Sequence, residues 1–145
     1  MAASKEIEQG TKFEPKFDAK GLITTISQDV ETGQILMVAY MDAEALEITM
    51  RTGNAIFYSR SRQKLWRKGE ESGHVQRVRQ ILVDCDQDCL ILKVKVDRGQ
   101  CHVGFQSCFY RILKPKTKEL EFIAEKVYDP EAAYKKNKDK VKNQN

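Results

Sequence analysis

The chain has 145 residues, 41% of them hydrophobic and 32% charged, which suits one domain with a core and a solvated surface. It has no apolar run of about 18 residues that could span a membrane, and its polar, acidic start does not predict a signal peptide. We therefore expect a cytoplasmic protein whose cysteines serve as metal ligands, catalysts or buried apolar side chains rather than as disulfides.

The net charge of +4 is concentrated in one place. Residues 134–145 hold five lysines and one aspartate, so residues 1–133 are neutral overall and the tail is a solvated extension. Inside the neutral body lies a basic island, which suits a small anionic ligand such as a phosphate ester, with ordinary surface charge as the alternative. Its basic members are Arg51, Arg60, Arg62, Lys64, Arg67, Lys68, Arg77 and Arg79, opposed by Glu70 and Glu71.

The first predicted elements are two strands. Residues 1–17 show no clear periodicity and are expected to form a loose lead-in. Apolar and β-branched residues then fill 22–30 and 34–41, and the short link between them contains Gly33, a typical turn residue. The pattern predicts a β-hairpin.

A short helix is predicted next, over residues 43–52. Asp42 is a suitable N-cap and Gly53 a suitable end. The residues at helical spacing that we expect to face a sheet are Ala43, Leu46 and Met50. Residues 54–59, rich in aromatic and β-branched side chains, predict a third strand.

The second half of the chain alternates between polar loops and strands. Residues 59–73 are polar and read as a long loop around Trp66, either functional or an anchor into the core. Strands are expected at 75–83, at 90–96 with strict alternation, and at 108–113, and a helix after Pro130. The predicted fold class is α+β, with a mostly antiparallel sheet and few helices.

Three aspartates alternate at Asp84, Asp86 and Asp88. In an extended segment their side chains would share one face, where a hard divalent cation would offset their repulsion. The spacing opens like an EF-hand loop, but Cys89 stands where that loop has glycine and Lys95 where it has glutamate. Magnesium is therefore favoured over calcium, and a solvated acidic turn is the alternative.

All four cysteines lie in residues 83–109, the stretch that also holds the three aspartates. They are Cys85, Cys89, Cys101 and Cys108. Thiolates favour borderline ions such as zinc. Three thiolates with an open position would make a catalytic site, whereas four would make a closed structural site, and Cys89 decides between the two. Because the set contains no C-x-x-C pair, packing of some cysteines as small hydrophobes is the alternative.

Two histidines accompany this stretch. His102 adjoins Cys101, and it is a candidate ligand, general base or structural side chain. His74 lies at the exit of the predicted loop and is interpreted as a hydrogen-bonding residue.

Four blocks, in order, resemble phosphoribosyl-AMP cyclohydrolase, the third enzyme of histidine biosynthesis. The resemblance runs from about Phe17 to Leu113, and the order of the blocks makes it specific. The blocks are Trp66-Arg-Lys-Gly-Glu-Glu-Ser-Gly73, Asp84-Cys-Asp-Gln-Asp88, Cys101-His-Val-Gly104 and Ser107-Cys-Phe-Tyr-Arg111.

This resemblance implies a hydrolase that acts on a cyclic amidine C–N bond, opening the adenine ring of N1-(5-phosphoribosyl)-AMP with water at its N1–C6 bond. It implies zinc and magnesium as cofactors and an intertwined homodimer whose zinc site takes cysteines from both chains. By position, the zinc ligands are Cys85, Cys101 and Cys108, and the magnesium ligands are Asp84, Asp86 and Asp88. Cys89 is then outside the zinc shell.

The resemblance also divides the chain into a lead-in (1–16), a cyclohydrolase domain (17–113) and a C-terminal extension with a lysine-rich tail (114–145). We expect the monofunctional form rather than a fusion with the pyrophosphatase of the preceding step. Val103 departs from the family, which commonly has threonine there, and removes a hydroxyl near the zinc loop.

The residues can be matched to the implied chemistry. Zinc lowers the pKa of a bound water toward ~7, and His102 is our hypothesis for the proton shuttle. The expected partner is a small nucleotide, whose phosphates we assign to Arg60, Arg62, Lys64 and Lys68, with Trp66, Glu70 and Ser72 in the substrate loop.

Two other functions compete with this one. A structural zinc module would use four thiolates, Cys89 included, and would unfold on chelation. A nucleic-acid binder would use Trp66 and the arginines, but the neutral body argues against it, because such domains carry a strongly positive face.

Overall fold

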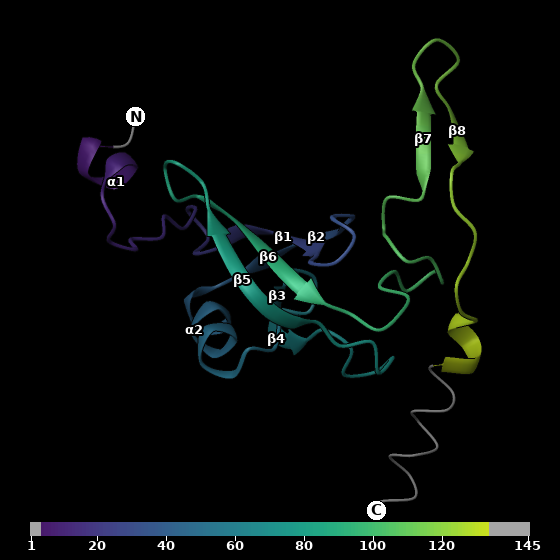
Figure 1. The fold of residues 1–145 in the computed structure, drawn as a ribbon, viewed down its shortest axis with the longest axis horizontal. Coiled ribbons are helices and arrows are strands. Elements are labelled where there is room, and N and C mark those ends of the chain that lie inside the picture. Colours follow the sequence, from purple (N-terminus) through teal and green to yellow (C-terminus); the bar gives the residue numbers. More distant parts are fainter. Residues whose placement is uncertain (1–3, 134–145) are drawn as a thin grey trace, which may run out of the picture.

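A computed structural model describes residues 4–133. Its centre is a four-stranded sheet in the order β2-β1-β6-β5, built from β1 (Ile23–Asp29), β2 (Ile35–Met41), β5 (Arg77–Val83) and β6 (Cys89–Lys95) (Figure 1). The β1–β2 and β5–β6 pairs are antiparallel, whereas β1 and β6 run parallel. The α+β class with mostly antiparallel pairing is therefore confirmed, and the intertwined homodimer stays a prediction.

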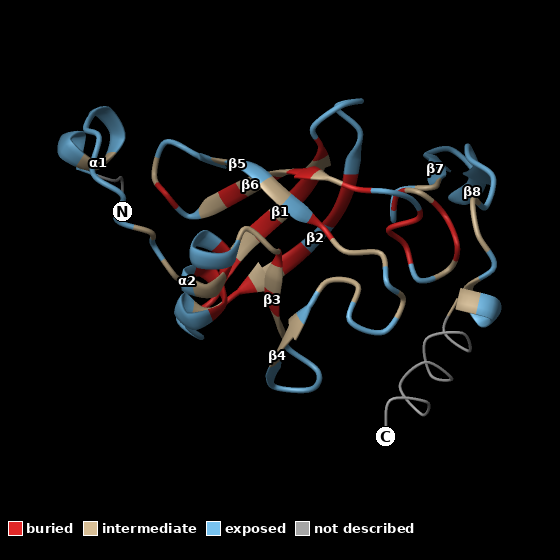
Figure 2. Cartoon of the chain, turned by 60° about the horizontal axis from the view of Figure 1, so that its bottom comes forward, coloured by how far each residue is buried: buried red, intermediate tan, exposed pale blue. Residues whose placement is uncertain are grey.

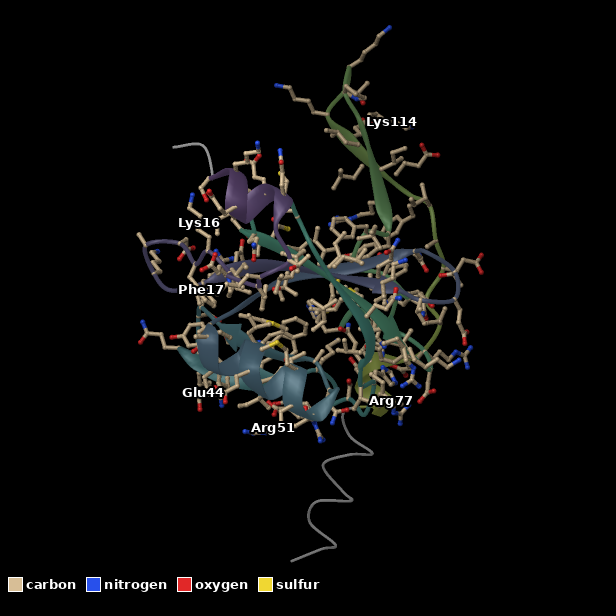
Figure 3. All side chains as sticks on the ribbon, turned by 60° about the vertical axis from the view of Figure 1, so that its left-hand side comes forward. Lys16, Phe17, Glu44, Arg51, Arg77 and Lys114 are labelled. Carbon is tan, nitrogen blue, oxygen red and sulfur yellow. The ribbon has the colours of Figure 1, made fainter. Side chains whose placement is uncertain are left out.

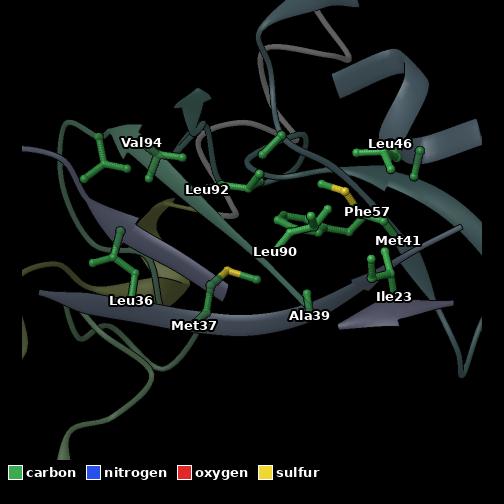
Figure 4. Close-up of a cluster of buried hydrophobic side chains, with 13 residues drawn as sticks. Ile23, Leu36, Met37, Ala39, Met41, Leu46, Phe57, Leu90, Leu92 and Val94 are labelled. Atoms are coloured by element: carbon green, nitrogen blue, oxygen red, sulfur yellow. The ribbon is translucent and has the colours of Figure 1, made fainter. Parts of the chain in front are cut away.

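The core lies on one face of this sheet. Along β6 the side chains alternate between buried and half-buried, and Leu90, Leu92 and Val94 are fully buried, as their spacing predicts. They pack against side chains of β2, of α2 and of the segment that follows α2 (Figure 4). Burying each such side chain stabilises the fold by about 1.5–3 kcal/mol. The cluster comprises Ile23, Leu36, Met37, Ala39, Met41, Ala45, Leu46, Ala55, Phe57, Leu90, Leu92, Val94 and Val96.

Helix α2 (Ala43–Thr52) begins and ends as predicted. The Asp42 carboxylate accepts the amide of Ala45 at 2.8 Å, and Gly53 closes the helix in the left-handed conformation, with φ of 75°.

The predicted inner face of α2 is partly wrong. Ala43 and Met50 are exposed, and Thr49 takes an inward position beside Ala45 and Leu46. The Thr49 hydroxyl donates to the Ala45 carbonyl at 2.8 Å and accepts the Ile56 amide at 3.0 Å. A buried threonine is tolerated there because its hydroxyl both donates and accepts a hydrogen bond. These two bonds also link the helix to the next strand.

The predicted loop at 59–73 contains a strand. β3 (Ile56–Ser59) and β4 (Lys64–Arg67) form an antiparallel hairpin in which Phe57 faces Trp66, with ring centroids 5.2 Å apart. A cross-strand aromatic pair stabilises such a hairpin and outweighs the polar composition that predicted a loop. Trp66 therefore anchors the hairpin against the core, and in sequence it stands between Lys64 and Arg67 of the basic island.

Both ends of the described chain also differ from expectation. The lead-in contains a short helix, α1 (Lys5–Gln9), capped by the Ser4 side chain. The strand predicted at 108–113 begins later, as β7 (Arg111–Lys114), and pairs with the unpredicted β8 (Glu119–Phe122). Residues 130–133 are helical, and the remainder of the predicted C-terminal helix lies outside the described residues.

The β7–β8 hairpin stands away from the central sheet (Figure 1). All eight of its strand residues are exposed (Figure 2), and Lys114 marks its outer end in Figure 3. Hairpins of two strands are marginal on their own, so this arm requires a surface to pack against.

Candidate metal centre

The three predicted magnesium ligands lie in the tight turn between β5 and β6. One carboxylate oxygen from each of Asp84, Asp86 and Asp88 lies within 4.8 Å of the others. Their convergence comes from a turn and not, as predicted, from the alternation of an extended strand. The Asp84 carboxylate accepts the amides of Asp88 and Cys89 at 3.0 and 3.1 Å, and Gln87 takes a positive φ of 60°.

The electrostatics of this turn suit a cation. Hydrogen bonding to Asp86, then to Asp84, raises the pKa of Asp88, whereas the hydrogen bond from Asp88 lowers the pKa of Asp86. The opposite directions of the two pKa shifts show that these neighbouring carboxylates interact. A hard dication with several water ligands fits three such carboxylates, of which Asp84 and Asp88 are exposed and Asp86 is half-buried.

Cys101 and Cys108 lie at the two ends of a loop that follows β6. The loop is closed by backbone bonds from Cys101 N to Phe105 O (3.0 Å) and from Gly104 N to Cys101 O (3.0 Å). It is held to β2 by the Cys108 amide, which donates to Leu36 O at 2.7 Å, and by the Ser107 hydroxyl.

The two thiols of this loop interact. Desolvation, followed by the neighbouring Cys101 thiol, raises the pKa of Cys108 to about 12. A thiol pair of this kind becomes a pair of ligands only when a dication replaces the protons, and thiolate pairs favour zinc. The donor set therefore fits the predicted metal.

Cys85 lies far from this pair within one chain. It is exposed in the β5–β6 turn, at the opposite end of β6 from the loop of Cys101 and Cys108 (Figure 1). The seven residues of β6 alone span about 23 Å at ~3.3 Å per residue. One chain brings together two of the three predicted zinc ligands. Cys89, half-buried at the start of β6, is on the Cys85 side.

A lysine accompanies the thiol pair. The Lys68 ammonium donates to the Gln100 carbonyl at 2.7 Å. Desolvation lowers the pKa of Lys68, and the nearby Cys108 and Cys101 thiols oppose this effect. His102 is exposed beside Cys101, so its imidazole is accessible to a ligand. His74 is half-buried, and its ring meets the ring of Tyr128 edge-on.

The structure gathers some of the predicted substrate residues. A pocket of about 80 Å³ is lined by Arg62, Trp66, Lys68, Glu70 and Ser72, together with Arg67, Gly69 and Glu71. Arg60 instead lies over the Tyr40 ring, 4.1 Å from its centroid, and Lys64 is exposed on β4. The pocket is too small for a whole nucleotide, because ligand pockets measure about 300–1,000 Å³.

Comparison with known proteins identifies the family. The sequence model described as phosphoribosyl-AMP cyclohydrolase matches residues 37–110. A phosphoribosyl-AMP cyclohydrolase of Bradyrhizobium diazoefficiens is 49% identical over 138 residues, covering 93% of this chain and 99% of the relative. The chain belongs to the phosphoribosyl-AMP cyclohydrolase family.

Two further relatives with the same description are equally similar. The relative from Methanococcoides burtonii is 53% identical over 119 residues, covering 82% of this chain and 94% of its own. That from Methanothermobacter thermautotrophicus is 51% identical over 122 residues, covering 84% and 88%. The resemblance inferred from the four blocks is confirmed. As a cyclohydrolase, the chain is an enzyme that hydrolyses a C–N bond of a cyclic amidine.

Two glutamines of this cyclohydrolase were missed by the sequence analysis. Gln76 is fully buried, accepts the Ser27 hydroxyl at 2.7 Å and donates to the Gln100 side chain at 3.0 Å, so it links the sheet to the residue before Cys101. Gln87 is buried within the acidic turn. Glutamine is usually exposed, so a single sequence holds no signal for either role.

The structure adds one observation about the membrane. Within residues 4–133, no helix of this cyclohydrolase is both long and apolar enough to cross a bilayer.

Proposed function

We propose that this chain hydrolyses the N1–C6 bond of the adenine ring of N1-(5-phosphoribosyl)-AMP, the third step of histidine biosynthesis, in the cytoplasm. The observation that carries the proposal is the loop after β6, closed by its own backbone bonds, which holds Cys101 and Cys108 at its two ends in a chain of this family. A pair of neighbouring thiols beside an exposed histidine is the arrangement expected of a metal-dependent hydrolase.

We further propose that the zinc site is shared in a homodimer. Cys101 and Cys108 supply two thiolates, and the third comes from Cys85 of the partner subunit, because the two groups lie at opposite ends of β6. Three thiolates would hold the ion and leave a position for water, as catalysis requires.

The exposed apolar residues of the β7–β8 arm support a dimer. Leu113 is 56% and Phe122 65% exposed, and Leu120, which pairs with Leu113 across the hairpin, is similarly exposed. Contiguous apolar exposure of this kind marks an interface. A second copy of the chain would cover the arm, and the same contact would bring the two ends of β6 from different chains together.

The proposed roles of the side chains follow from their positions. Zinc supplies an activated water at neutral pH. The water oxygen would bond to C6 and the bond from C6 to N1 would break; one water proton would end on N1 and the other on the exocyclic nitrogen, which leaves C6 as a carboxamide carbon. His102, exposed next to a ligand, accepts the proton of water and returns one to N1. The Asp84–Asp88 turn would hold magnesium, whose charge suits substrate phosphate.

The pocket lined by Arg62 and Lys68 supports the assignment of one phosphate. Arg62 and Lys68 reach it from the hairpin and from the segment after it, and Lys68 is adjacent to both thiols. A volume of about 80 Å³ suits a phosphate group rather than a base. Arg60 and Lys64 do not line this pocket, so they would bind a phosphate only with extended side chains or from a partner chain.

The decisive test is turnover of N1-(5-phosphoribosyl)-AMP by the purified full-length protein, followed by the absorbance change on ring opening, with and without a zinc chelator. We expect chelator-sensitive turnover that zinc restores. Comparing the variants Cys101→Ser and Cys89→Ser distinguishes a catalytic zinc site from a structural zinc site with four thiolates. The first should lose zinc and activity, and the second should keep both. Folded, zinc-loaded protein without turnover would refute the proposal.

A further inference from the structure

The segment that follows the β7–β8 hairpin folds back onto the loop that carries the thiol pair. The Val127 amide donates to the Gly104 carbonyl at 2.8 Å, and the Tyr128 hydroxyl donates to the Cys101 carbonyl at 2.6 Å. This segment lies beyond residues 37–110, the region that the family model matches. The C-terminal extension therefore contacts the proposed zinc site directly.

Two glycines of the loop make room for this contact. A Cβ atom at Gly99, where φ is +56°, would overlap the Tyr128 ring. A Cβ at Gly104 would lie 2.8 Å from the Tyr128 carbonyl oxygen, closer than packed atoms approach. The loop and the returning segment thus pack so closely that a side chain at either glycine would clash with Tyr128.

The Tyr128 ring also packs against a histidine. The His74 and Tyr128 rings meet at 89° with centroids 4.5 Å apart. The Nδ1 atom of His74 is buried and has no hydrogen-bond partner in the described part of the chain. Its ring therefore contributes a packing surface here, and Tyr128 is held between that surface and the loop.

The consequence falls on the backbone of Cys101. Its carbonyl accepts from Gly104 N at 3.0 Å and from the Tyr128 hydroxyl at 2.6 Å, so both of its lone pairs are used and its peptide plane is fixed. The Cys101 amide donates to Phe105 O at 3.0 Å, so the peptide groups on both sides of the Cys101 Cα are held, and the direction of its Cα–Cβ bond is held with them. A change in the peptide plane would redirect the thiol away from Cys108.

We propose that Tyr128 is a positioning residue that fixes the Cys101 backbone so that the Cys101 and Cys108 thiols share one zinc ion. The inference rests on the proposed function, because it presumes the zinc site. It assigns a role in the site to an extension that the family motifs leave out.

The test compares Tyr128→Phe with Tyr58→Phe in the full-length protein. Both variants lose one hydroxyl, but Tyr58 belongs to β3 and not to the segment that folds back onto the loop. Zinc affinity is measured by competition with a chromophoric chelator, and the visible spectrum of the cobalt-substituted protein reports the thiolate geometry. We expect about tenfold weaker zinc binding and a shifted cobalt spectrum in Tyr128→Phe, and neither change in Tyr58→Phe.

Several outcomes would overturn the inference. One is a Tyr128→Phe variant with unchanged zinc affinity and spectrum. Another is a lower urea midpoint with an unchanged cobalt spectrum, which would show a merely structural role. A wild-type protein that binds neither zinc nor cobalt would remove the proposed zinc site itself. That result is distinguishable because it is obtained before any variant is made.

Discussion

Gln87 connects the acidic turn to the N-terminal segment, and replacing it should release that segment. Its side-chain carbonyl accepts the Glu14 amide at 2.7 Å, and its amide group donates to the carbonyls of Ile7 and Lys12 at 3.3 and 3.1 Å. Its own backbone carbonyl accepts the Lys16 amide at 2.7 Å. The residue is only 6% exposed. Gln87→Ala removes the three side-chain bonds.

The expected cost can be worked from these bonds. Each is worth about 1 kcal/mol net, and the backbone groups of an exposed segment regain part of that by hydration, which leaves a destabilisation of about 2 kcal/mol. Glutamine and alanine carry a similar penalty for the positive φ at this position. The change in the free energy of unfolding therefore measures the loss of the side-chain hydrogen bonds.

The measurement is urea unfolding at fixed protein concentration, because a dimer would make stability concentration-dependent. With a slope of about 2 kcal/mol per molar urea, Gln87→Ala should lower the midpoint by about 1 M. Gln80→Ala, an exposed glutamine on β5, is the control and should change it little. Hydrogen exchange at the Glu14 and Lys16 amides should accelerate in Gln87→Ala. Unchanged exchange at both amides would refute the reasoning.

Three further predictions concern other parts of the molecule. Trp66→Ala should cost about 2–3 kcal/mol in urea unfolding, because it deletes the half-buried ring that packs on Phe57; an unchanged midpoint would exclude this contact as an anchor. Backbone hydrogen bonds from Leu22, then from Lys20, lower the pKa of Asp18, so its contribution is present above about pH 4 and lost as pH falls through the depressed value. Asp18→Asn should therefore flatten the acid limb of the stability profile, and an unaltered limb would contradict this. Leu113→Lys, on the apolar arm, should shift sedimentation toward the monomer; an intact dimer would show that the arm is not the interface.

Local sequence determined much of this fold. The ends of α2 follow from Asp42 and Gly53, whose side chain and conformational freedom act within one turn of the helix. The alternation of β6 follows from a two-residue period that a buried face makes visible. The metal-ligating residue types and the ordered motifs were likewise present in the chain itself, and the family comparison confirmed the identification they suggested.

Tertiary structure alone decided which polar residues are inside and which ligands meet. Thr49 and Gln76 are buried because distant backbone and side-chain groups satisfy them, which no local pattern records. Strand β4 exists because Trp66 finds Phe57 across a hairpin. Cys101 meets Cys108 through a loop closed by its own backbone bonds, while Cys85 remains at the far end of β6. Spacing in the sequence says which ligand types are available, but a separation in space is fixed only when the strand between them is folded.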